Sequence, residues 1–322
     1  MLMLQYQNLL LQSVLSERLD PETPPLGIDQ VVSDFDNVTF HISNPDPKDK
    51  SVIMVSMYIK CFQDLVKCGA KQILEREYGP YLTEPEPGYD VSLLLNLTDG
   101  SIPSDPEARD ELVNKIALLK RNTFAAPFEK AFDKFDQLAE EAAAEGKDLY
   151  APQKSDNEVM AIHYRDEESI YVRPSYDRVT VIFSTIFKDE TDRIFGKVFL
   201  QEFVDARRRA IQNAPQVLYT QKEPPLEIRD VVKPSSNADN MGYVTFVLFP
   251  RHLVASRREN CISHIQIFRD YFHYHIKCSK AYMHSRMRFR VSEFLKVLNR
   301  AKQENVVKEK KTASGRTFKH SH

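Results

Sequence analysis

The sequence predicts an α+β protein with two tandem α+β domains of similar plan, followed by one long C-terminal helix. Segments rich in β-branched and aromatic residues alternate with helical segments, and the order strands, helix, strand, helix occurs in both halves of the chain. In addition, no Gly or Pro occurs from Arg251 to Ser314, which favours one extended helix near the end of the chain.

The first domain is expected over residues 1–138. Its leucine-rich first segment is interpreted as an amphipathic helix, which the Pro-rich segment 19–30 ends. A turn-rich sequence between two apolar runs predicts a β-hairpin. The predicted elements are strands at 38–43, 52–60 and 89–97 and helical regions at 61–78 and 106–135.

The second domain is expected over residues 158–255. It follows the segment 139–157, which is rich in Ala and Glu and then polar, and which is interpreted as the linker between the domains. The predicted elements are strands at 159–164, 169–174, 179–187, 215–219 and 242–249 and a helix at 189–211.

The last predicted helix covers residues 256–303, and a basic tail follows at 304–322. Ser256 and Glu259 have the spacing of a capping box, in which two side chains satisfy backbone donors at a helix start. A helix of this length spans roughly 70 Å at about 1.5 Å per residue. It therefore needs a surface outside its own domain.

Charge is distributed unevenly along the 322 residues, although the net charge is only −2. Residues 1–268 carry a net charge of −12, residues 269–302 carry +7, and residues 303–322 carry +3. A basic arm on an acidic body indicates an acidic partner. No apolar run reaches 18 residues, so a membrane span is not expected.

The sequence gives no indication of a metal, a cofactor or catalysis. Its four cysteines form no CxxC pair and are interpreted as reduced core thiols of a cytosolic protein. His273 and His275 are two residues apart, so on a helix they point to opposite sides and cannot share a metal. Phosphate-loop, dinucleotide, zinc-protease and nucleophile-elbow motifs are absent. The arginines at 207–209 suit a helix end, where cations are favourable, and need no substrate. The acidic residues at 166–168 fall in a hairpin loop and need no catalytic role.

Apolar residues of the last helix form two stripes. One contains Ile265, Phe268, Phe272, Ile276, Met283, Met287, Val291, Phe294 and Leu298, and the other contains Ile267, Tyr271, Tyr274, Cys278, Tyr282 and Phe289. We expect one stripe to pack on the chain's own domain and the other on a partner chain; the alternative is that both face this protein's own sheets. The residues predicted for a subunit interface are Ile265, Phe268, Phe272, Ile276, Met283, Met287, Phe294 and Leu298.

Basic residues occupy much of the remaining helix surface, and acidic residues are nearly absent there. An ordinary solvated face would mix both signs, so a binding face is favoured. Its partner could be a nucleic acid or an acidic protein filament, although no nucleic-acid-binding motif is present. The predicted binding residues are Lys280, Arg286, Arg288, Arg290, Lys296, Arg300 and Lys302.

Several long blocks of the sequence resemble a known family. The clearest are RVTVIFSTIFKDE (178–190), APQVLYTQKEPPLE (214–227), GYVTFVLFPRH (242–252) and FRDYFHYHIKCSKAYMHSRMR (268–288), and FDNVTFHISNP (35–45) matches more loosely. These blocks are similar to subunit two of the actin-related-protein two/three complex. The resemblance covers nearly the whole chain, but segment 139–157 is longer than the family pattern and the first twenty residues match weakly.

The resemblance implies a structural role. It implies two related α+β domains and a long helix that pairs with the small subunit four in the scaffold of the complex. It also implies contact with the side of a mother actin filament, while nucleation belongs to the two actin-related subunits. The basic residues given above would then bind the filament. No ATP site and no nucleic-acid partner is expected. The protein would be located in the cytoplasm, in cortical actin structures.

Overall fold

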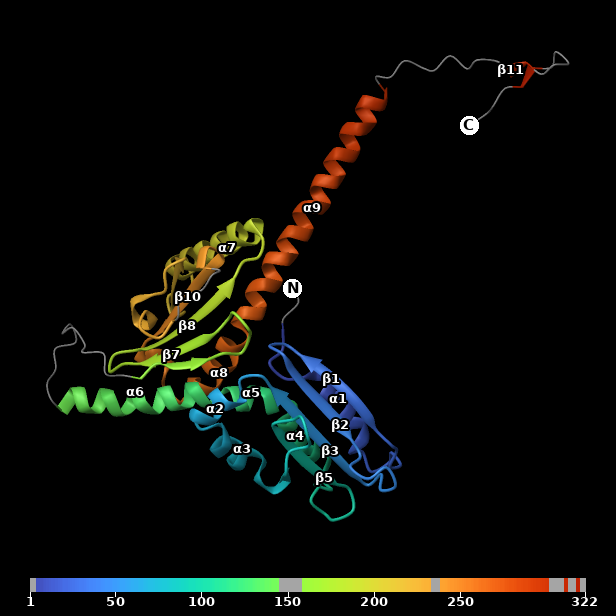
Figure 1. Ribbon diagram of the computed structural model, residues 1–322, viewed down its shortest axis with the longest axis vertical. Coiled ribbons are helices and arrows are strands. Elements are labelled where there is room, and N and C mark those ends of the chain that lie inside the picture. The colour runs from blue at the N-terminus through green and yellow to red at the C-terminus, as the bar shows by residue number, and fades with distance from the viewer. Residues whose placement is uncertain (1–3, 145–157, 233–237, 301–309, 312–316, 319–322) are drawn as a thin grey trace. The chain divides into compact units, whose positions relative to one another are not determined.

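The computed structural model describes residues 4–144, 158–232, 238–300, 310–311 and 317–318 (Figure 1). The chain divides into two compact units, Met1–Tyr274 and His275–His322. The first unit contains two five-stranded antiparallel sheets, and the long helix α9 crosses the division between the units. This arrangement of separate helices and antiparallel sheets confirms the predicted α+β class.

The first sheet has the strand order β1-β2-β3-β5-β4. The predicted hairpin is present, and Ile42 of β2 pairs with Val55 of β3, which pairs in turn with Leu93 of β5. These three residues are fully buried, because they form one continuous apolar row across the sheet. The strands are β1 (Asp29–Asp34), β2 (Val38–Ser43), β3 (Val52–Ile59), β4 (Leu82–Thr83) and β5 (Val91–Asn96).

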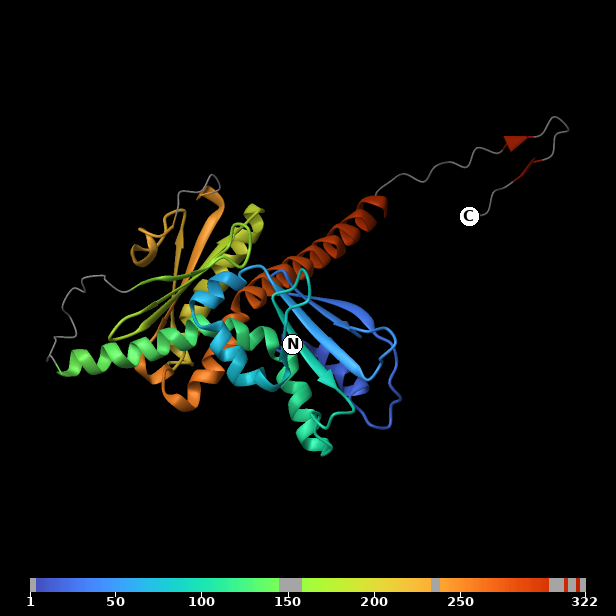
Figure 2. The same cartoon turned by 60° about the horizontal axis from the view of Figure 1, so that its bottom comes forward.

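Helices α1 and α4 of the first half pack against each other, whereas α6 packs against β7 and β8 of the second sheet (Figure 2). The single helical region predicted at 61–78 is two helices, because Gly69 has a φ of 101° and ends the first one. Helix α6 continues to Ala144, so residues 139–144 of the predicted linker are helical. Residues 145–157 of that linker lie outside the described residues. The helices are α1 (Leu9–Arg18), α2 (Phe62–Lys67), α3 (Ala70–Tyr78), α4 (Pro106–Ala117), α5 (Leu119–Phe124) and α6 (Ala126–Ala144), with a 3₁₀ turn at Gly79–Tyr81.

The second sheet repeats the plan of the first, with the order β6-β7-β8-β10-β9. All eight residues of β10 are buried, because both faces of the sheet are covered. Helix α7 (Glu190–Arg209) and the start of α9 cover one face, and the segment around Ile228 covers the other. The strands are β6 (Met160–Ile162), β7 (Ile170–Pro174), β8 (Val179–Ile186), β9 (Gln216–Gln221) and β10 (Met241–Leu248), with 3₁₀ turns at Leu226–Ile228, Ala238–Asn240 and Pro250–His252.

The C-terminal helix differs from the prediction of one continuous helix over 256–303. Helix α8 (Ala255–Gln266) and helix α9 (Phe268–Arg300) are separated at Ile267. The predicted capping box is wrong, because Ser256 lies inside α8 and the N-cap residue is Val254, which makes no side-chain cap. Within the tail at 304–322, the structure describes only β11 (Lys310–Lys311) paired with β12 (Thr317–Phe318). Across the described helices, none combines the length and apolar character needed to span a membrane.

Candidate protein-interaction surface on helix α9

An aromatic cluster holds the first turns of α9 in the core. The ring of Phe268 lies 4.5 Å from that of Phe246 and 5.4 Å from that of Phe183, both on the second sheet. The ring of Phe272 lies 6.0 Å from that of Phe187 and 5.6 Å from that of Phe199. The sheet and α7 therefore fix where the helix begins.

This placement corrects part of the predicted subunit interface. Ile265, Phe272 and Ile276 are only 6%, 1% and 2% exposed, and Phe268 is half-buried within the aromatic cluster. Residues so deeply buried in their own chain cannot form a surface for another subunit. The fully exposed part of the predicted interface begins at Met283.

Beyond this point the helix is exposed on every side. All twenty residues from Ala281 to Arg300 are exposed, and they follow one continuous helical course (Figure 1). Nine of them are large hydrophobic residues: Tyr282, Met283, Met287, Phe289, Val291, Phe294, Leu295, Val297 and Leu298. Isolated helices are marginal in water, and an exposed apolar surface of this kind marks an interaction site.

Five of these residues form a narrow row, which we call the apolar stripe: Met283, Met287, Val291, Phe294 and Leu298. The last four have spacings of four, three and four, the repeat of a helix–helix seam. Tyr282 and Phe289, from the second predicted stripe, are 63% and 64% exposed and lie on another side of the helix. The expected division into one inner and one outer face therefore does not describe residues 281–300, where both predicted stripes are exposed. The division runs along the axis instead, from a buried start to an exposed remainder.

The predicted binding residues lie on the same exposed part of the helix. At about 100° per residue, Arg288, Lys296 and Arg300 lie about 100° or more from the centre of the apolar stripe, and we call these three the basic face. Within the part of the chain that the structure describes, Arg288, Arg290 and Arg300 form no ion pair, whereas Lys296 contacts Glu293 at 2.8 Å. Arg286 donates a hydrogen bond of 2.7 Å to the Tyr282 hydroxyl, Lys280 is half-buried, and Lys302 lies outside the described residues.

A buried ionic cluster centred on Glu168 stands at the base of α9, and sequence reasoning missed it. One carboxylate oxygen lies 2.7 Å from Arg269 Nη2. The other accepts hydrogen bonds from the Thr185 hydroxyl at 2.9 Å and the Ile186 N–H at 3.0 Å. The residue follows β6 in the expected loop, but it is 5% exposed and joins that loop to β8 and α9. Burial of a charge depends on distant segments, which no local signal in the sequence reports.

The same cluster extends to the first half of the chain through Arg165 and Asp36. Arg165 Nη2 lies 3.0 Å from an Asp36 carboxylate oxygen, and Lys120 Nζ lies 3.5 Å from the other oxygen. Farther along, Arg121 of α5 donates to the Glu259 carboxylate at 2.7 Å and to the Ser263 hydroxyl at 3.0 Å in α8. Both contacts join residues more than a hundred positions apart, so they connect the two halves directly.

Asp270 and His273 of this cluster have shifted pKa values. Burial, together with the neighbouring Asp36, raises the pKa of Asp270 to about 6. Burial and the nearby Arg269 lower the pKa of His273 to about 4, so this imidazole is neutral and shares a hydrogen bond of 2.9 Å with the Thr185 hydroxyl. His273 is thus a packed residue at the base of the helix.

The cysteines agree only in part with the prediction of core thiols. Cys61 and Cys68 are buried, and burial raises the pKa of the Cys61 thiol to about 12. Cys261 is half-buried and Cys278 is exposed on α9, so Cys278 is not a core residue. Within the described residues, no group of three or more His, Cys, Asp or Glu side chains is placed to hold a metal ion.

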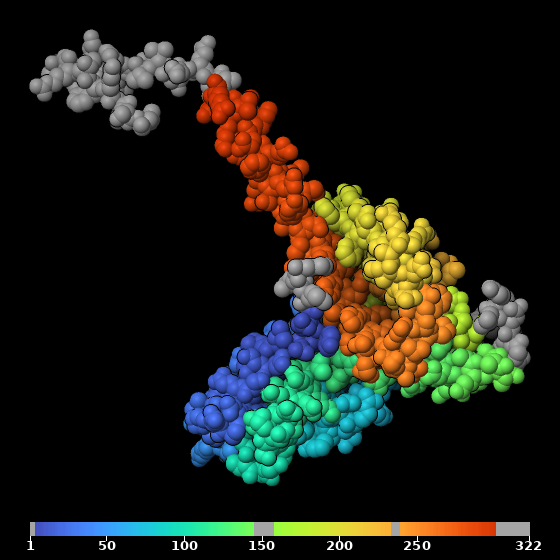
Figure 3. All heavy atoms as spheres, turned by 180° about the vertical axis from the view of Figure 1, so that it is seen from behind, coloured from blue at the N-terminus to red at the C-terminus, as the bar shows by residue number. Residues whose placement is uncertain are grey.

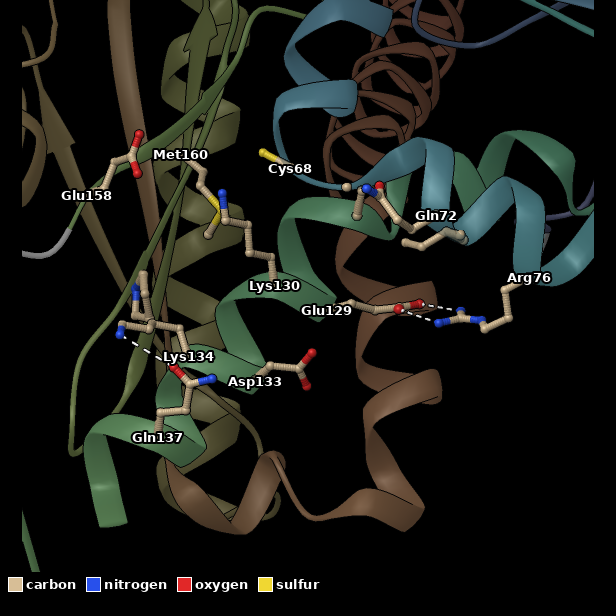
Figure 4. Close-up of a pocket in the computed structure, with 14 residues that line it drawn as sticks. Cys68, Gln72, Arg76, Glu129, Lys130, Asp133, Lys134, Gln137, Glu158 and Met160 are labelled. Carbon is tan, nitrogen blue, oxygen red and sulfur yellow. Dashed lines mark hydrogen bonds and ion pairs between the residues drawn. The ribbon is translucent and has the colours of Figure 1, made fainter. Parts of the chain in front are cut away.

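A hollow on the first unit lies between α3, α6 and the start of β6 and has a volume of about 740 Å³ (Figure 4). Its lining includes three basic and three acidic side chains, and Arg76 and Glu129 pair across it at 2.9 Å. Because these charges balance, the hollow offers no concentrated charge to an ionic ligand. Helix α9, by contrast, carries both an excess of basic side chains and a row of exposed apolar residues.

Comparison with known proteins identifies the family. A family model described as "Arp2/3 complex, 34 kD subunit p34-Arc" matches residues 55–305. The chain belongs to this P34-Arc family. The match extends from β3 to the end of α9 and therefore includes the whole candidate surface. It confirms the resemblance found in the sequence.

Two relatives match over most of their length. The chain is 54% identical over 321 residues to a protein of Schizosaccharomyces pombe named actin-related protein 2/3 complex subunit 2, and 99% of each chain is covered. It is 41% identical over 293 residues to a protein of the same name from Dictyostelium discoideum, and 91% of each chain is covered. The P34-Arc match and these two relatives agree on the same subunit.

Proposed function

We propose that this chain is a structural subunit of the Arp2/3 complex whose helix α9 serves two contacts. The apolar stripe pairs with a helix of a sister subunit, the small subunit four, and the basic face binds the side of an actin filament. One observation carries the proposal: twenty consecutive exposed residues of one helix bear both surfaces. The family and the names of both relatives support membership in the complex.

The geometry of the apolar stripe supports the proposed helix pairing. A helix with a row of apolar residues repeating about every 3.5 residues buries that row most completely against a second helix. Leu295 and Val297 flank the row and are 57% and 61% exposed, which widens the surface that a partner would cover.

The charge of the same segment supports the proposed filament binding. From Lys277 to Arg300 the helix carries seven basic side chains and only one acidic side chain, Glu293. Filament surfaces are acidic, and complementary charge increases the rate and the specificity of association. The unpaired state of Arg288 and Arg300 among the described residues leaves their donors available to such a partner.

This role is that of a scaffold in the cytoplasm, at cortical actin structures, and it does not include catalysis. Nucleation would belong to the two actin-related subunits, which this chain would hold in position near the mother filament. The alternative of a nucleic-acid-binding protein has no support in the comparisons, since both relatives are named as subunits of the complex.

The test is sedimentation of the co-expressed complex with actin filaments across a salt series. A triple variant, Arg288→Glu, Lys296→Glu and Arg300→Glu, should assemble normally and lose about tenfold or more in filament affinity, a free-energy change of about 1.4 kcal/mol. Binding of the unmodified complex should weaken as salt rises. A control of equal charge change, Lys48→Glu, Lys50→Glu and Lys71→Glu, alters three exposed lysines of the first half and should bind normally.

Three results would count against the proposal. Unchanged filament binding by the triple variant would remove the filament contact from α9. Loss of assembly in that variant would show that the basic face packs against sister subunits. Competition by RNA, with its binding lost in the triple variant, would favour the nucleic-acid alternative.

A further inference from the structure

A second basic surface, remote in sequence from α9, lies where α7 ends and α8 begins. Segments 207–214 and 250–257 contain five arginines and no Asp or Glu. We call Arg207, Arg208, Arg209, Arg251 and Arg257 the arginine patch. Figure 3 shows the two segments next to each other, in yellow and orange.

Backbone carbonyl groups fix three arginines of the patch without neutralising them. Arg207 Nε donates to the Ala214 carbonyl at 3.0 Å, Arg251 Nη2 donates to the Gln212 carbonyl at 3.4 Å, and Arg257 Nη1 donates to the Arg251 carbonyl at 3.3 Å. A neutral carbonyl positions a guanidinium but leaves its charge uncompensated. These contacts also tie the loop after α7 to the start of α8.

The positive potential of the patch acts on a buried neighbour. His252 Nε2 lies 2.8 Å from the Asn213 carbonyl oxygen, and burial lowers the pKa of this imidazole. The hydrogen bond with Asn213 raises this pKa, whereas Arg251, Arg207 and Arg257 lower it further. The nearby Arg258, by contrast, is paired with Asp136 at 2.6 Å and is not part of the patch.

Two exposed aliphatic residues lie among these arginines. Ile211 follows Arg209 by two positions and is 58% exposed, and Val254 lies between Arg251 and Arg257 and is 45% exposed. Arginines surrounding exposed aliphatic side chains match a surface that is negatively charged outside and apolar just beneath, as an anionic membrane is. A nucleic acid would favour exposed aromatic rings for stacking, and segments 207–214 and 250–257 contain none.

We propose that the arginine patch docks this subunit on the surface of an anionic phospholipid membrane. The arginines interact with lipid phosphates and carboxylates, and Ile211 and Val254 enter the boundary between headgroups and acyl chains. This inference goes beyond the proposed function and does not depend on filament binding by α9.

The test is sedimentation of the assembled complex with phosphatidylcholine vesicles that contain or lack phosphatidylserine. The variant Arg208→Glu with Arg209→Glu changes two exposed side chains at the end of α7 and should bind the anionic vesicles about thirty-fold or more weakly, since each lost arginine is worth about 1 kcal/mol. The variant Ile211→Ser with Val254→Ser should bind more weakly while its net charge is unchanged. The control Lys188→Glu with Lys197→Glu reverses two other exposed charges next to or on α7 and should behave as wild type.

Binding to anionic vesicles that both variants retain in full would overturn the proposal, as would an equal loss in the control. Each complex is also sedimented with actin filaments. If the arginine variant lost filament binding and kept vesicle binding, the patch would be a filament contact and the membrane proposal would be wrong. If the α9 triple variant bound filaments as well as wild type, the proposed filament contact would be wrong, but the measured binding to vesicles would still test the membrane proposal.

Discussion

At the scale of one residue, the buried carboxylate of Asp270 at the base of α9 makes the stability of the protein depend on pH. The carboxylate is buried between Arg269 at 3.4 Å and Arg165 at 3.8 Å, and burial raises its pKa from an ordinary 3.8 to about 6. The folded protein therefore binds a proton more tightly than the unfolded chain between these two pH values. Its unfolding free energy falls as the pH rises through this window, and the ionised form costs stability above it.

Replacement of Asp270 by Asn should therefore change stability in a pH-dependent way. The unfolding free energy of Asp270→Asn, relative to wild type, should rise by about 1–3 kcal/mol between about pH 5 and about pH 7.5, because the variant never ionises there. His273, whose pKa is lowered, contributes the opposite slope in both proteins, so it cancels in the difference. Chemical denaturation at a series of pH values measures this effect.

Asp166→Asn is the matched control for that experiment. Asp166 is exposed, and its hydrogen bond with Lys60 keeps the pKa of the carboxyl below its usual range. Its carboxylate stays ionised over the whole window, so the stability difference should not vary with pH. A flat profile for Asp270→Asn as well would show that the buried carboxylate has no raised pKa.

Gly196 permits the close approach of α7 to the aromatic cluster. A Cβ atom at this position would lie 2.9 Å from ring atoms of both Phe187 and Phe272. Gly196→Ala should therefore lower the unfolding free energy by about 1–3 kcal/mol, although alanine is the better helix former. Denaturant unfolding measures the change, and Lys197→Ala, at an exposed position one residue away, serves as the control. A stabilised Gly196→Ala protein would show that the rings can move aside at little cost.

Glu168 and Phe272 show which residue properties the sequence can and cannot predict. Periodicity placed Phe272 correctly on an apolar helix face, but it could not say whether its neighbours belong to this chain or to another. Glu168 appeared as one of three acids in a loop, although it is the buried centre of the ionic cluster. The neighbours of Phe272 and the burial of Glu168 both depend on segments far away in the sequence.

At the scale of elements, strands were predicted more accurately than helix ends. The runs of β2, β3 and β8 contain dense β-branched and aromatic residues with clear turns beside them. Strand β1 was missed because it follows a Pro-rich segment. The break at Ile267 could not be predicted from a Gly or Pro, because none is present there. Ser256 matched a capping pattern although it lies inside a helix. Local patterns indicate where a helix can start, but tertiary packing decides where it does.

The apolar stripe leads to a prediction for α9 as an element. Met287→Asp and Phe294→Asp should each prevent assembly with the sister subunits, because a charge would be buried in the helix–helix contact. Both residues are 60% or more exposed in the chain alone, so its own fold should survive. Co-purification of the subunits measures assembly, and circular dichroism checks the fold of the single chain.

Ser285→Asp provides the control for these two variants. Ser285 is exposed on the same helix, about 160° from the centre of the apolar stripe. It should assemble normally. Equal loss of assembly in all three variants would indicate that any added negative charge is harmful, and normal assembly of Phe294→Asp would remove the stripe from the interface.

At the scale of the whole molecule, two sheets with the same strand order share one compact unit. The similar plan of the two halves was predictable from the repeated order of strands and helices. The contacts that join them were not, since Arg121 with Glu259 and Arg165 with Asp36 are pairs of ordinary surface residue types. We infer that these contacts hold the halves as a single platform from which α9 starts.

Amide hydrogen exchange along α9, in the chain alone and in the assembled complex, tests the central claim most directly. In the chain alone, residues 268–276 should exchange slowly and residues 281–300 rapidly, because only the first group is packed in the core. In the complex, residues 281–300 should become as protected as the start of the helix. Rapid exchange of residues 281–300 in the complex would contradict the claim that a partner covers this surface.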